Sequence, residues 1–331
     1  MTEKTFKAMI VEETPEKKYS RRIGERAISE LPKGDVLVRV AWSSLNFKDA
    51  LSATGNKGVT RNFPHTPGID AAGIVEESSS AKFSKGDEVI VTSYDLGMNT
   101  SGGFGQYIRV PAEWVVKRPE GLTLKEGMAF GTAGLTAGLS VYQLVKHDVT
   151  PEKGEVLVTG ASGGVGSVAA AILAKIGFDV TAVSGKDEAF LKSLGVKKVI
   201  KREEAVDTSK RPLLGGLWAG VVDTVGGDIL ATALKGMKPH STATCCGLVM
   251  SPALNTTVFP FILRGVTLVG IDSQDCPMDI RVKVWEKLAS DWKIDMLDDI
   301  TAEVNLAELD SLIDTILKGG IKGRTVVDLS K

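Results

Sequence analysis

A glycine-rich turn between a short apolar run and an Ala-rich run constrains this chain more than any other feature. Residues 154–177 have the sequence GEVLVTGASGGVGSVAAAILAKIG. Val156–Val158 is β-branched and apolar, as a buried parallel strand should be, and Val168–Lys175 consists mainly of strong helix formers. Such a strand, turn and helix place the free N–H groups of the first helical turn where an anion can bind. The segment therefore predicts a dinucleotide site with the pyrophosphate at the helix N-terminus.

The same turn also fits a serine-hydrolase motif. Gly160, Ser162 and Gly164 have the G-x-S-x-G spacing of a nucleophile elbow. That chemistry needs an acid and then a histidine later in the chain, and His240 is the one histidine after Ser162. No HGGG-type oxyanion loop precedes the motif. A hydrolase that uses Ser162 remains the weaker alternative, beside a plain strand-to-helix turn without a ligand.

The pattern of apolar residues changes near Lys125. Before it, short β-type runs separated by Gly and Pro turns predict a barrel or sandwich. After it, strands alternate with helices, which predicts an α/β fold with a doubly wound parallel sheet of about six strands. In the tail we expect a helix over 306–317 and a strand over 325–329 that pairs back with the first domain. The strands expected in the parallel sheet are 156–158, 179–183, 198–200, 220–223, 242–245 and 267–270.

Composition narrows the class of protein. The chain has 331 residues, 43% of them hydrophobic, and a net charge of −1, so bulk charge gives no reason to expect a nucleic-acid partner. We expect no membrane span and no signal peptide, because no apolar run approaches about 18 residues. Three late cysteines, Cys245, Cys246 and Cys276, suit a reducing cytoplasm. The sequence holds no C-x-x-C or H-E-x-x-H motif, and we expect no metal.

The end of the second strand of the parallel sheet selects the dinucleotide. An acidic residue there would bind the ribose 2′-hydroxyl of NAD, but this strand ends in Ser184-Gly185-Lys186. A hydroxyl, a flexible backbone and a cation suit a 2′-phosphate, and Arg202 after the next strand can reach the same pocket. These residues predict NADPH. The alternative is that Lys186 and Arg202 are ordinary solvated charges.

Several further segments have a common resemblance. They are Ser44–Asp49, Pro67–Gly73, Lys85–Val89, Gly131–Ala137 and Val222–Gly227. Together they resemble the zinc-free medium-chain dehydrogenases/reductases over nearly the whole chain. A closer resemblance to the YhdH/YhfP quinone oxidoreductase group, which includes acrylyl-CoA reductases, is carried by Ser184–Lys186, Trp218–Gly220, Val258–Arg264 and Gly270–Ser273.

The resemblance implies a GroES-like β-barrel catalytic domain, residues 1–124 completed by 294–331, and a Rossmann domain, residues 125–293. It also implies a homodimer. The zinc-dependent members have Gly-His-Glu where this chain has Gly68-Ile69-Asp70, and a catalytic cysteine in the early loop where this chain has none. We therefore expect hydride transfer from NADPH to an activated C=C bond, as in acrylyl-CoA or a small enone, or to a quinone. An NADPH-binding sensor without turnover remains an alternative.

By resemblance, Asn46, Phe47 and Asp70 line the substrate cleft. Asn46 can donate to an enolate oxygen, and Asp70 can orient Asn46 or a water, or act as an acid if burial raises its pKa. The alternatives are local roles, a loop Asn bound to its own backbone and a structural cap. The implied cofactor contacts are Phe47, Ser162, Gly163, Gly164, Val165, Ser184, Gly185, Lys186, Arg202, Leu248, Ile262 and Ser273. The candidate cations for a CoA substrate are Lys48, Lys57 and Arg61.

Overall fold

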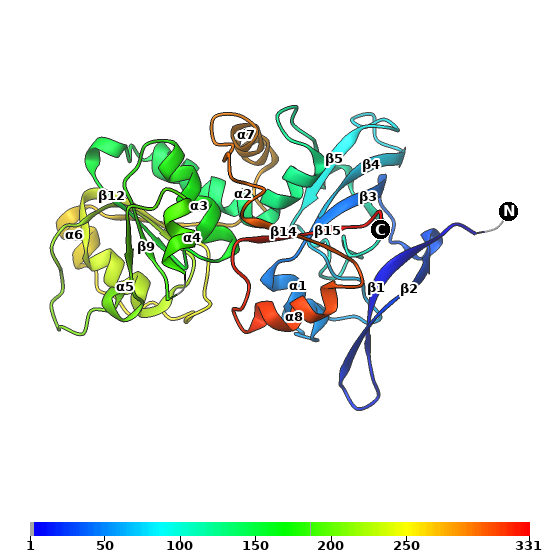
Figure 1. The fold of residues 1–331 in the computed structure, drawn as a ribbon, viewed down its shortest axis with the longest axis horizontal. Helices are drawn as coiled ribbons and strands as arrows, with labels where there is room; N and C mark the ends of the chain where they lie inside the picture. Colours follow the sequence, from blue (N-terminus) through cyan, green and yellow to red (C-terminus); the bar gives the residue numbers. More distant parts are fainter. Residues whose placement is uncertain (1–2, 186) are drawn as a thin grey trace. The chain divides into compact units, whose positions relative to one another are not determined.

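The computed structural model describes residues 3–185 and 187–331, and Figure 1 labels its elements. These residues form two compact units. The first consists of the chain up to Thr132, Gln274–Val282 and Leu297–Lys331, and the second of Ala133–Ser273 and Lys283–Met296. Two helices pass through the division, α2 (Leu124–Lys146) and α7 (Met278–Leu288).

The first unit is built on a mostly antiparallel sheet. Along the sheet the strands are β14 (Thr301–Asn305), β15 (Arg324–Asp328), β3 (Val36–Ser44), β4 (Asp70–Ser78), β5 (Glu88–Thr92) and β7 (Val115–Lys117), with β6 (Tyr107–Val110) also paired to β3. Val36, Val38 and Val40 alternate along β3 and are buried in the core. Val327 of β15 lies opposite Ser43 of β3, which confirms that the tail strand pairs back with the first domain.

Two short helices pack together beside this sheet. They are α1 (Phe47–Ala53) and α8 (Leu309–Leu317), the second buried through Leu309 and Ile313. Because α1 begins directly after β3, its N-terminus is held at the end of a buried strand. The sequence predicted the tail helix but not α1, whose seven residues, about two turns, carry little periodic signal.

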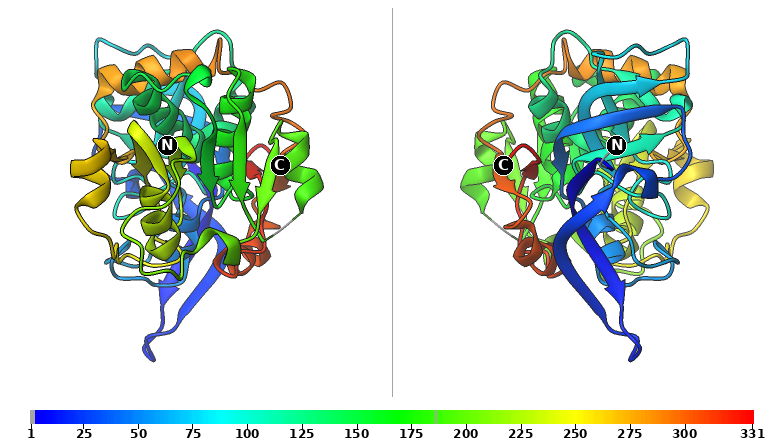
Figure 2. Two further views of the ribbon diagram at one scale, coloured as in Figure 1. Left: turned by 90° about the vertical axis from the view of Figure 1, so that its left-hand side faces the viewer. Right: turned by 90° about the vertical axis from the view of Figure 1, so that its right-hand side faces the viewer.

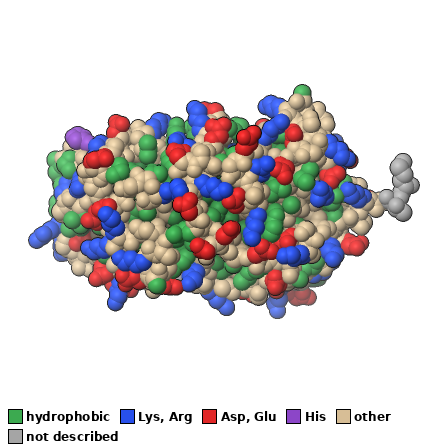
Figure 3. Space-filling view, turned by 45° about the horizontal axis from the view of Figure 1, so that its top comes forward, with side chains coloured by type: hydrophobic (Ala, Val, Ile, Leu, Met, Phe, Trp, Pro, Cys, Tyr) green, Lys and Arg blue, Asp and Glu red, His purple; other side chains and the backbone are tan. Residues whose placement is uncertain are grey.

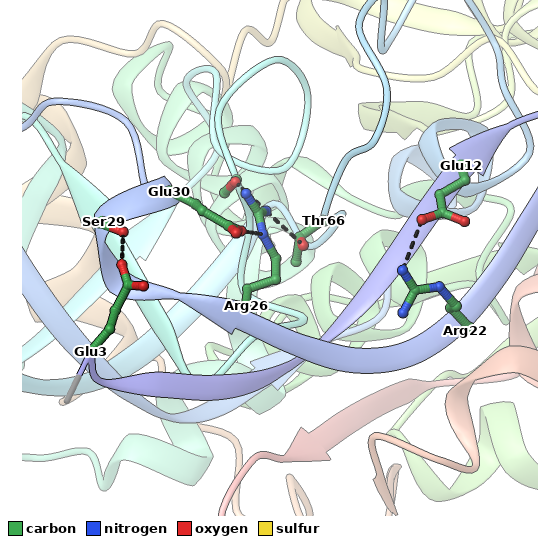
Figure 4. A network of polar contacts seen from close by, with 8 residues as sticks. Glu3, Glu12, Arg22, Arg26, Ser29, Glu30 and Thr66 are labelled. Carbon is green, nitrogen blue, oxygen red and sulfur yellow. Dashed lines mark hydrogen bonds and ion pairs between the residues drawn. The ribbon is translucent and has the colours of Figure 1, made fainter.

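The sequence did not predict the N-terminal hairpin of the first unit. The hairpin consists of β1 (Thr5–Glu13) and β2 (Tyr19–Ala27), and Figure 2 shows it as a long blue ribbon. Its second strand is largely exposed and charged, so it lacks the apolar run by which a strand is recognised. Polar contacts hold the hairpin, among them the Arg22–Glu12 pair and the contacts of Arg26 in Figure 4.

The second unit is a six-stranded parallel sheet, as the sequence predicted. Its strand order is β10 (Lys198–Ile200), β9 (Val180–Val183), β8 (Val156–Thr159), β11 (Trp218–Asp223), β12 (Met237–Cys245) and β13 (Thr267–Gly270). This order reverses direction between β8 and β11, which is the topology of a Rossmann sheet and places the ligand crevice at that reversal. The helices between its strands are α3 (Gly164–Lys175), α4 (Glu188–Ser193), α5 (Gly227–Lys235) and α6 (Phe259–Arg264).

Among the described residues, α2 is the one helix long and apolar enough to span a membrane by length and composition. Its most apolar window is 78% buried inside the protein, as in a core helix. The backbone also leaves the helical conformation at Gly131, with φ 53° and ψ −155°, so neither part of α2 reaches 18 residues. Composition alone did not reveal this break.

Candidate functional site

Asn46 and Asp70 meet at one end of the antiparallel sheet. Asp70 is the first residue of β4, and Asn46 is the N-cap of α1, directly after β3. Because β3 and β4 are antiparallel and Ser43 lies opposite Ala71, the end of one strand meets the start of the other. The Asn46 side-chain amide nitrogen lies 2.8 Å from Asp70 Oδ2, and both side chains are buried.

Asp70 is surrounded by hydrogen-bond donors. Its Oδ2 accepts from Ser44 Oγ at 2.6 Å, from Asn46 Nδ2 at 2.8 Å and from the Thr132 amide at 2.9 Å. Its Oδ1 accepts from Thr132 Oγ1 at 2.5 Å. Because each of these partners donates to Asp70, this arrangement suits a side chain that orients its neighbours.

A buried guanidinium, missed by the sequence analysis, lies beside this pair. Arg324 begins β15 and is 3% exposed. Its Nε donates to the Ala129 carbonyl at 2.8 Å, Nη2 donates to Ser44 Oγ at 3.0 Å, and Nη1 lies 3.4 Å from Asn46 Oδ1. Burial lowers the pKa of Arg324, and the nearby carboxyl groups of Asp70 and Asp49 oppose this shift. The Ser44 hydroxyl thus bridges a cation and a carboxylate.

Asp49 is a second buried acid at this site, also missed from the sequence. Its carboxylate accepts from the backbone N–H of Asn46 and from that of Ile69, both at 2.7 Å. Burial raises the pKa of Asp49 to about 7, the Asp70 carboxylate adds to the rise, and the two backbone donors oppose it. Asn46 is itself a predicted catalytic residue, and Ile69 directly precedes the other one, Asp70. The two hydrogen bonds of Asp49 therefore fix the backbone at both predicted catalytic residues.

Gly131 explains how the break in α2 serves this cluster. Its φ of 53° lies in the left-handed region that favours glycine. A Cβ on Gly131 would lie 2.5 Å from Asp70 Oδ2 and 2.6 Å from Ser44 Oγ, so a side chain would displace the network. The break also turns the Thr132 amide toward Asp70. Gly131 belongs to one of the segments that carry the family resemblance, but its local sequence predicts no role for it.

The glycine turn of the second unit has the shape that a pyrophosphate cradle requires. Helix α3 begins at Gly164, its N-cap is Gly163, and no described side chain caps it. A Cβ on Gly166 would overlap the Gly160 carbonyl oxygen and lie 2.8 Å from the Ala161 Cα. The first-turn amides of α3 thus follow a tightly packed turn, and the residues present fit an anionic cofactor.

The predicted 2′-phosphate residues lie at the ends of neighbouring strands. Ser184 follows β9, and its hydroxyl donates to Ser162 Oγ at 3.2 Å, which joins the two predicted cofactor segments. The exposed Arg202 side chain lies beside Gly185, with Nε 3.8 Å from where a Cβ on that glycine would stand. Lys186 lies outside the described residues.

The remaining predicted contacts are less constrained. Leu248 and Ile262 are 66% and 67% exposed, and Ser273 Oγ accepts from Thr136 Oγ1 at 2.8 Å. Phe47 begins α1 and is 40% exposed.

Two of the three candidate cations for CoA have other partners. Lys57 forms an ion pair with Glu13 at 2.7 Å, and Lys48 donates to Gln274 Oε1 at 2.7 Å. Arg61 is exposed.

The geometry opposes the hydrolase alternative. Thr242 of β12 and Val156, the first residue of β8, are both level with Gly220 of β11, so His240 lies in the part of β12 that precedes the start of β8, toward the amino-terminal end of the strands. Ser162 follows the carboxyl end of β8, at the opposite edge. The two side chains cannot form a nucleophile–base pair across a sheet.

Comparison with known proteins assigns the family. An alcohol dehydrogenase GroES-like domain model matches residues 32–120, and a zinc-binding dehydrogenase model matches 164–290. The putative quinone oxidoreductase YhfP of Bacillus subtilis is 46% identical over 91% of this chain and 92% of its own length. The acrylyl-CoA reductase AcuI of Ruegeria pomeroyi is 44% identical over 98% and 99%. The chain belongs to the YhdH/YhfP group of the medium-chain dehydrogenases/reductases.

Solved structures of this group were determined with dinucleotides. The yhdH oxidoreductase of Salmonella enterica, in complex with NADP, has a TM-score of 0.94 and 42% identity over 97% of this chain and 99% of that one. Bacillus subtilis yhfP, with NAD bound, has a TM-score of 0.95 and 44% identity over 98% and 99%. The resemblance stated from the sequence is thus confirmed, and so are the GroES-like and Rossmann folds.

The second family model is named for zinc-binding dehydrogenases. Within residues 3–185 and 187–331, no group of three or more His, Cys, Asp or Glu side chains could hold a metal ion. In this member of the YhdH/YhfP group, Asn46, Asp70 and Arg324 make a polar cluster built from an amide, a carboxylate and a guanidinium.

Proposed function

We propose that this protein is an NADPH-dependent reductase that adds hydride to the activated C=C bond of acrylyl-CoA or a small enone, or reduces a quinone. One observation carries the proposal, namely a buried amide, Asn46, held between Asp70 and Arg324. The similarity to an acrylyl-CoA reductase and to putative quinone oxidoreductases supports the substrate class. We assign the substrate chemistry to residues 1–124 with 294–331, and cofactor binding to 125–293.

The chain's own residues would stabilise the charge that the reaction creates. NADPH, when bound, supplies the hydride for the β-carbon. Negative charge then develops on the carbonyl oxygen of the substrate, and a fixed N–H donor lowers the barrier. Asn46 Nδ2 has two N–H groups, of which one donates to Asp70 at 2.8 Å. The second has just weak contacts with Ser44, at 3.4 Å, and is the donor we assign to the enolate oxygen.

Asp70 acts in this proposal as the residue that orients Asn46. An Asn side chain can turn over at little cost unless its two ends face different partners. Here the amide nitrogen faces the Asp70 carboxylate and the amide oxygen faces Arg324 Nη1. Turning the amide would place its oxygen against a carboxylate and its nitrogen against a guanidinium, so the N–H side stays toward Asp70.

The cofactor contacts follow from the second unit. We assign the pyrophosphate to Ser162 and the first-turn residues Gly163, Gly164 and Val165, and the 2′-phosphate to Ser184, Gly185, Lys186 and Arg202. We assign Phe47, Leu248, Ile262 and Ser273 to the nicotinamide end. The yhdH complex with NADP supports NADPH, while the yhfP complex with NAD and the lysine at position 186 suggest a moderate preference.

NADPH oxidation across acryloyl-CoA, crotonyl-CoA, simple enones and quinones tests the proposal. We expect turnover with acryloyl-CoA or an enone, and a loss of kcat of about a hundredfold in Asn46→Ala, the usual cost of an oxyanion donor. The KM for NADPH should stay unchanged in that variant. Activity confined to quinones would overturn the CoA hypothesis, and full turnover by Asn46→Ala would remove its proposed role.

We further propose that the protein is a cytoplasmic homodimer without a nucleic-acid or membrane partner. Figure 3 shows Lys and Arg interspersed with Asp and Glu over the face drawn, so that face offers no single-sign surface to a polyanion. Cys245, Cys246 and Cys276 are free thiols, as suits a reducing compartment. The second unit exposes several large apolar side chains beside its edge strand β13, which supports pairing with a second copy.

A further inference from the structure

The two residues after β5 have a strained backbone. Ser93 has φ 65° and Tyr94 has φ 51°, so two consecutive non-glycine residues occupy the left-handed region. Such residues persist where the surroundings enforce them, and they cluster at functional sites. Ser93 is 3% exposed, so its hydroxyl points into the protein and not to solvent.

The Ser93 hydroxyl begins a chain of hydrogen bonds that ends on Asp70. Ser93 Oγ lies 2.8 Å from Thr132 Oγ1, and Thr132 Oγ1 lies 2.5 Å from Asp70 Oδ1. A carboxylate oxygen accepts and does not donate, so the Thr132 proton points to Asp70. Ser93 must then donate to Thr132. The Thr132 hydroxyl, which holds one oxygen of Asp70, is thus itself held by Ser93.

The strain is what allows Ser93 to reach this partner. Thr92 lies opposite Asp70 in the ladder of β4 and β5, so both side chains face the same side of the sheet. In a regular strand the next residue, Ser93, would face the other side. The left-handed φ at Ser93 breaks this alternation, while its N–H still donates to the Ile69 carbonyl at 2.8 Å.

A buried arginine and a stacked tryptophan hold the strained turn. Arg281 Nη1 donates to the Thr92 carbonyl at 2.9 Å and to Thr92 Oγ1 at 3.0 Å. Its guanidinium lies 4.3 Å from the centre of the Tyr94 ring, a cation–π distance. Trp114 stacks on the same ring at 5.5 Å with 5° between the planes. The turn therefore keeps one conformation at the edge of the site.

We propose that Ser93 is a positioning residue of the reductase site, set in place by the strained Ser93–Tyr94 turn. It acts through Thr132, which fixes one oxygen of Asp70 while the other oxygen orients the Asn46 amide. The inference rests on the proposed function, because Asn46 is its endpoint. Loss of the Ser93 hydroxyl removes the donor that holds the Thr132 hydroxyl oxygen, and Asp70 and Asn46 then sample orientations that do not serve the substrate oxygen.

Two substitutions at one position separate positioning from structural support. Ser93→Ala removes the hydroxyl and keeps the strain, whereas Ser93→Gly removes both, since glycine tolerates a positive φ. We expect Ser93→Gly to have the higher Tm of the two. Both should lose kcat about tenfold with an unchanged KM for NADPH, and the glycine variant should be no more active than the alanine variant.

Lys17→Gly is the matched control for the effect of strain. Lys17 has φ 58° in the turn between β1 and β2, so the change relieves the same kind of strain outside the polar cluster and should leave kcat unchanged. If Ser93 had only a structural role, activity would follow Tm and the glycine variant would be the more active one. That order, or a Ser93→Ala kcat within about twofold of the unsubstituted protein, overturns the proposal.

A double-substitution cycle provides a second test. Thr132→Val keeps the shape of the side chain and removes the hydroxyl through which Ser93 is proposed to act. Adding Ser93→Ala to Thr132→Val should then lower kcat no further, whereas a full additive loss contradicts the relay. A different result would contradict the proposed function itself, namely that the unsubstituted protein oxidises NADPH with none of the electrophiles. The Ser93 proposal fails when that activity is present and the variants keep it.

Discussion

At the scale of single residues, Arg324 deserves the first test because it contacts Asn46 and bridges to Asp70 through Ser44. Arg324→Met should lower kcat by roughly ten- to a hundredfold, since the amide loses the partner of its oxygen and the buried carboxylates lose their cation. The dissociation constant for NADPH, measured by fluorescence, should not change. Arg26→Met is the control, because Arg26 donates to Thr66 and Ser101 in the same unit (Figure 4). A kcat within twofold in Arg324→Met would contradict this role.

Asp49 gives the fold a pH dependence that can also be tested one residue at a time. Its pKa is raised by burial and by Asp70 to about 7 in the folded protein, from an ordinary value of 3.8. Between these values the folded state binds more protons than the unfolded state, so this group makes stability fall as pH rises from about 4 to 7. Asp49→Asn should flatten the decrease of Tm across this range, measured by thermal unfolding. It should also lower Tm, because the amide nitrogen cannot accept from a backbone N–H. An unchanged slope would mean that another group sets it.

Some residues of the candidate site can be identified from the local sequence, and others cannot. Asn46 and Asp70 belong to segments that carry the family resemblance, and through that resemblance the sequence predicted both as residues of the substrate site. Arg324 lies more than 250 positions after Asn46 in a strand that also holds Thr325 and Asp328, and nothing local distinguishes it from a surface arginine. Ser44, Asp49 and Thr132 acquire their roles through strand register and the break at Gly131. Such roles arise from tertiary contacts that one sequence does not reveal.

At the scale of elements, apolar periodicity predicted the parallel sheet and its six strands, because strands buried on both faces have continuous apolar runs. It failed for β2 and β14, which have few buried residues, and it also missed β1, although much of that strand is buried. The glycine turn between β8 and α3 can also be tested as one element of the fold. Gly166→Ala should raise the dissociation constant for NADPH at least tenfold, since its Cβ would overlap the Gly160 carbonyl and widen the cradle. Gly215→Ala, where a Cβ meets no atom within 4 Å, is the control. Equal affinity in both variants would show that the turn does not set the cradle.

At the scale of the whole molecule, the proposed homodimer explains an exposure that a single copy does not. Val249, Val258 and Leu263 are 70%, 63% and 62% exposed and lie in the chain between β12 and β13, and the outer edge of β13 has no partner among the described strands. An apolar surface beside an open sheet edge favours pairing with an identical copy about a two-fold axis. Leu263→Glu would bury a charge in that contact and should shift the protein from dimer to monomer in sedimentation velocity. Ile23→Glu, at an isoleucine 39% exposed in β2 of the first unit, adds the same charge outside this surface and should remain dimeric. If Leu263→Glu sediments as the unsubstituted protein does, the dimer interface does not include Leu263.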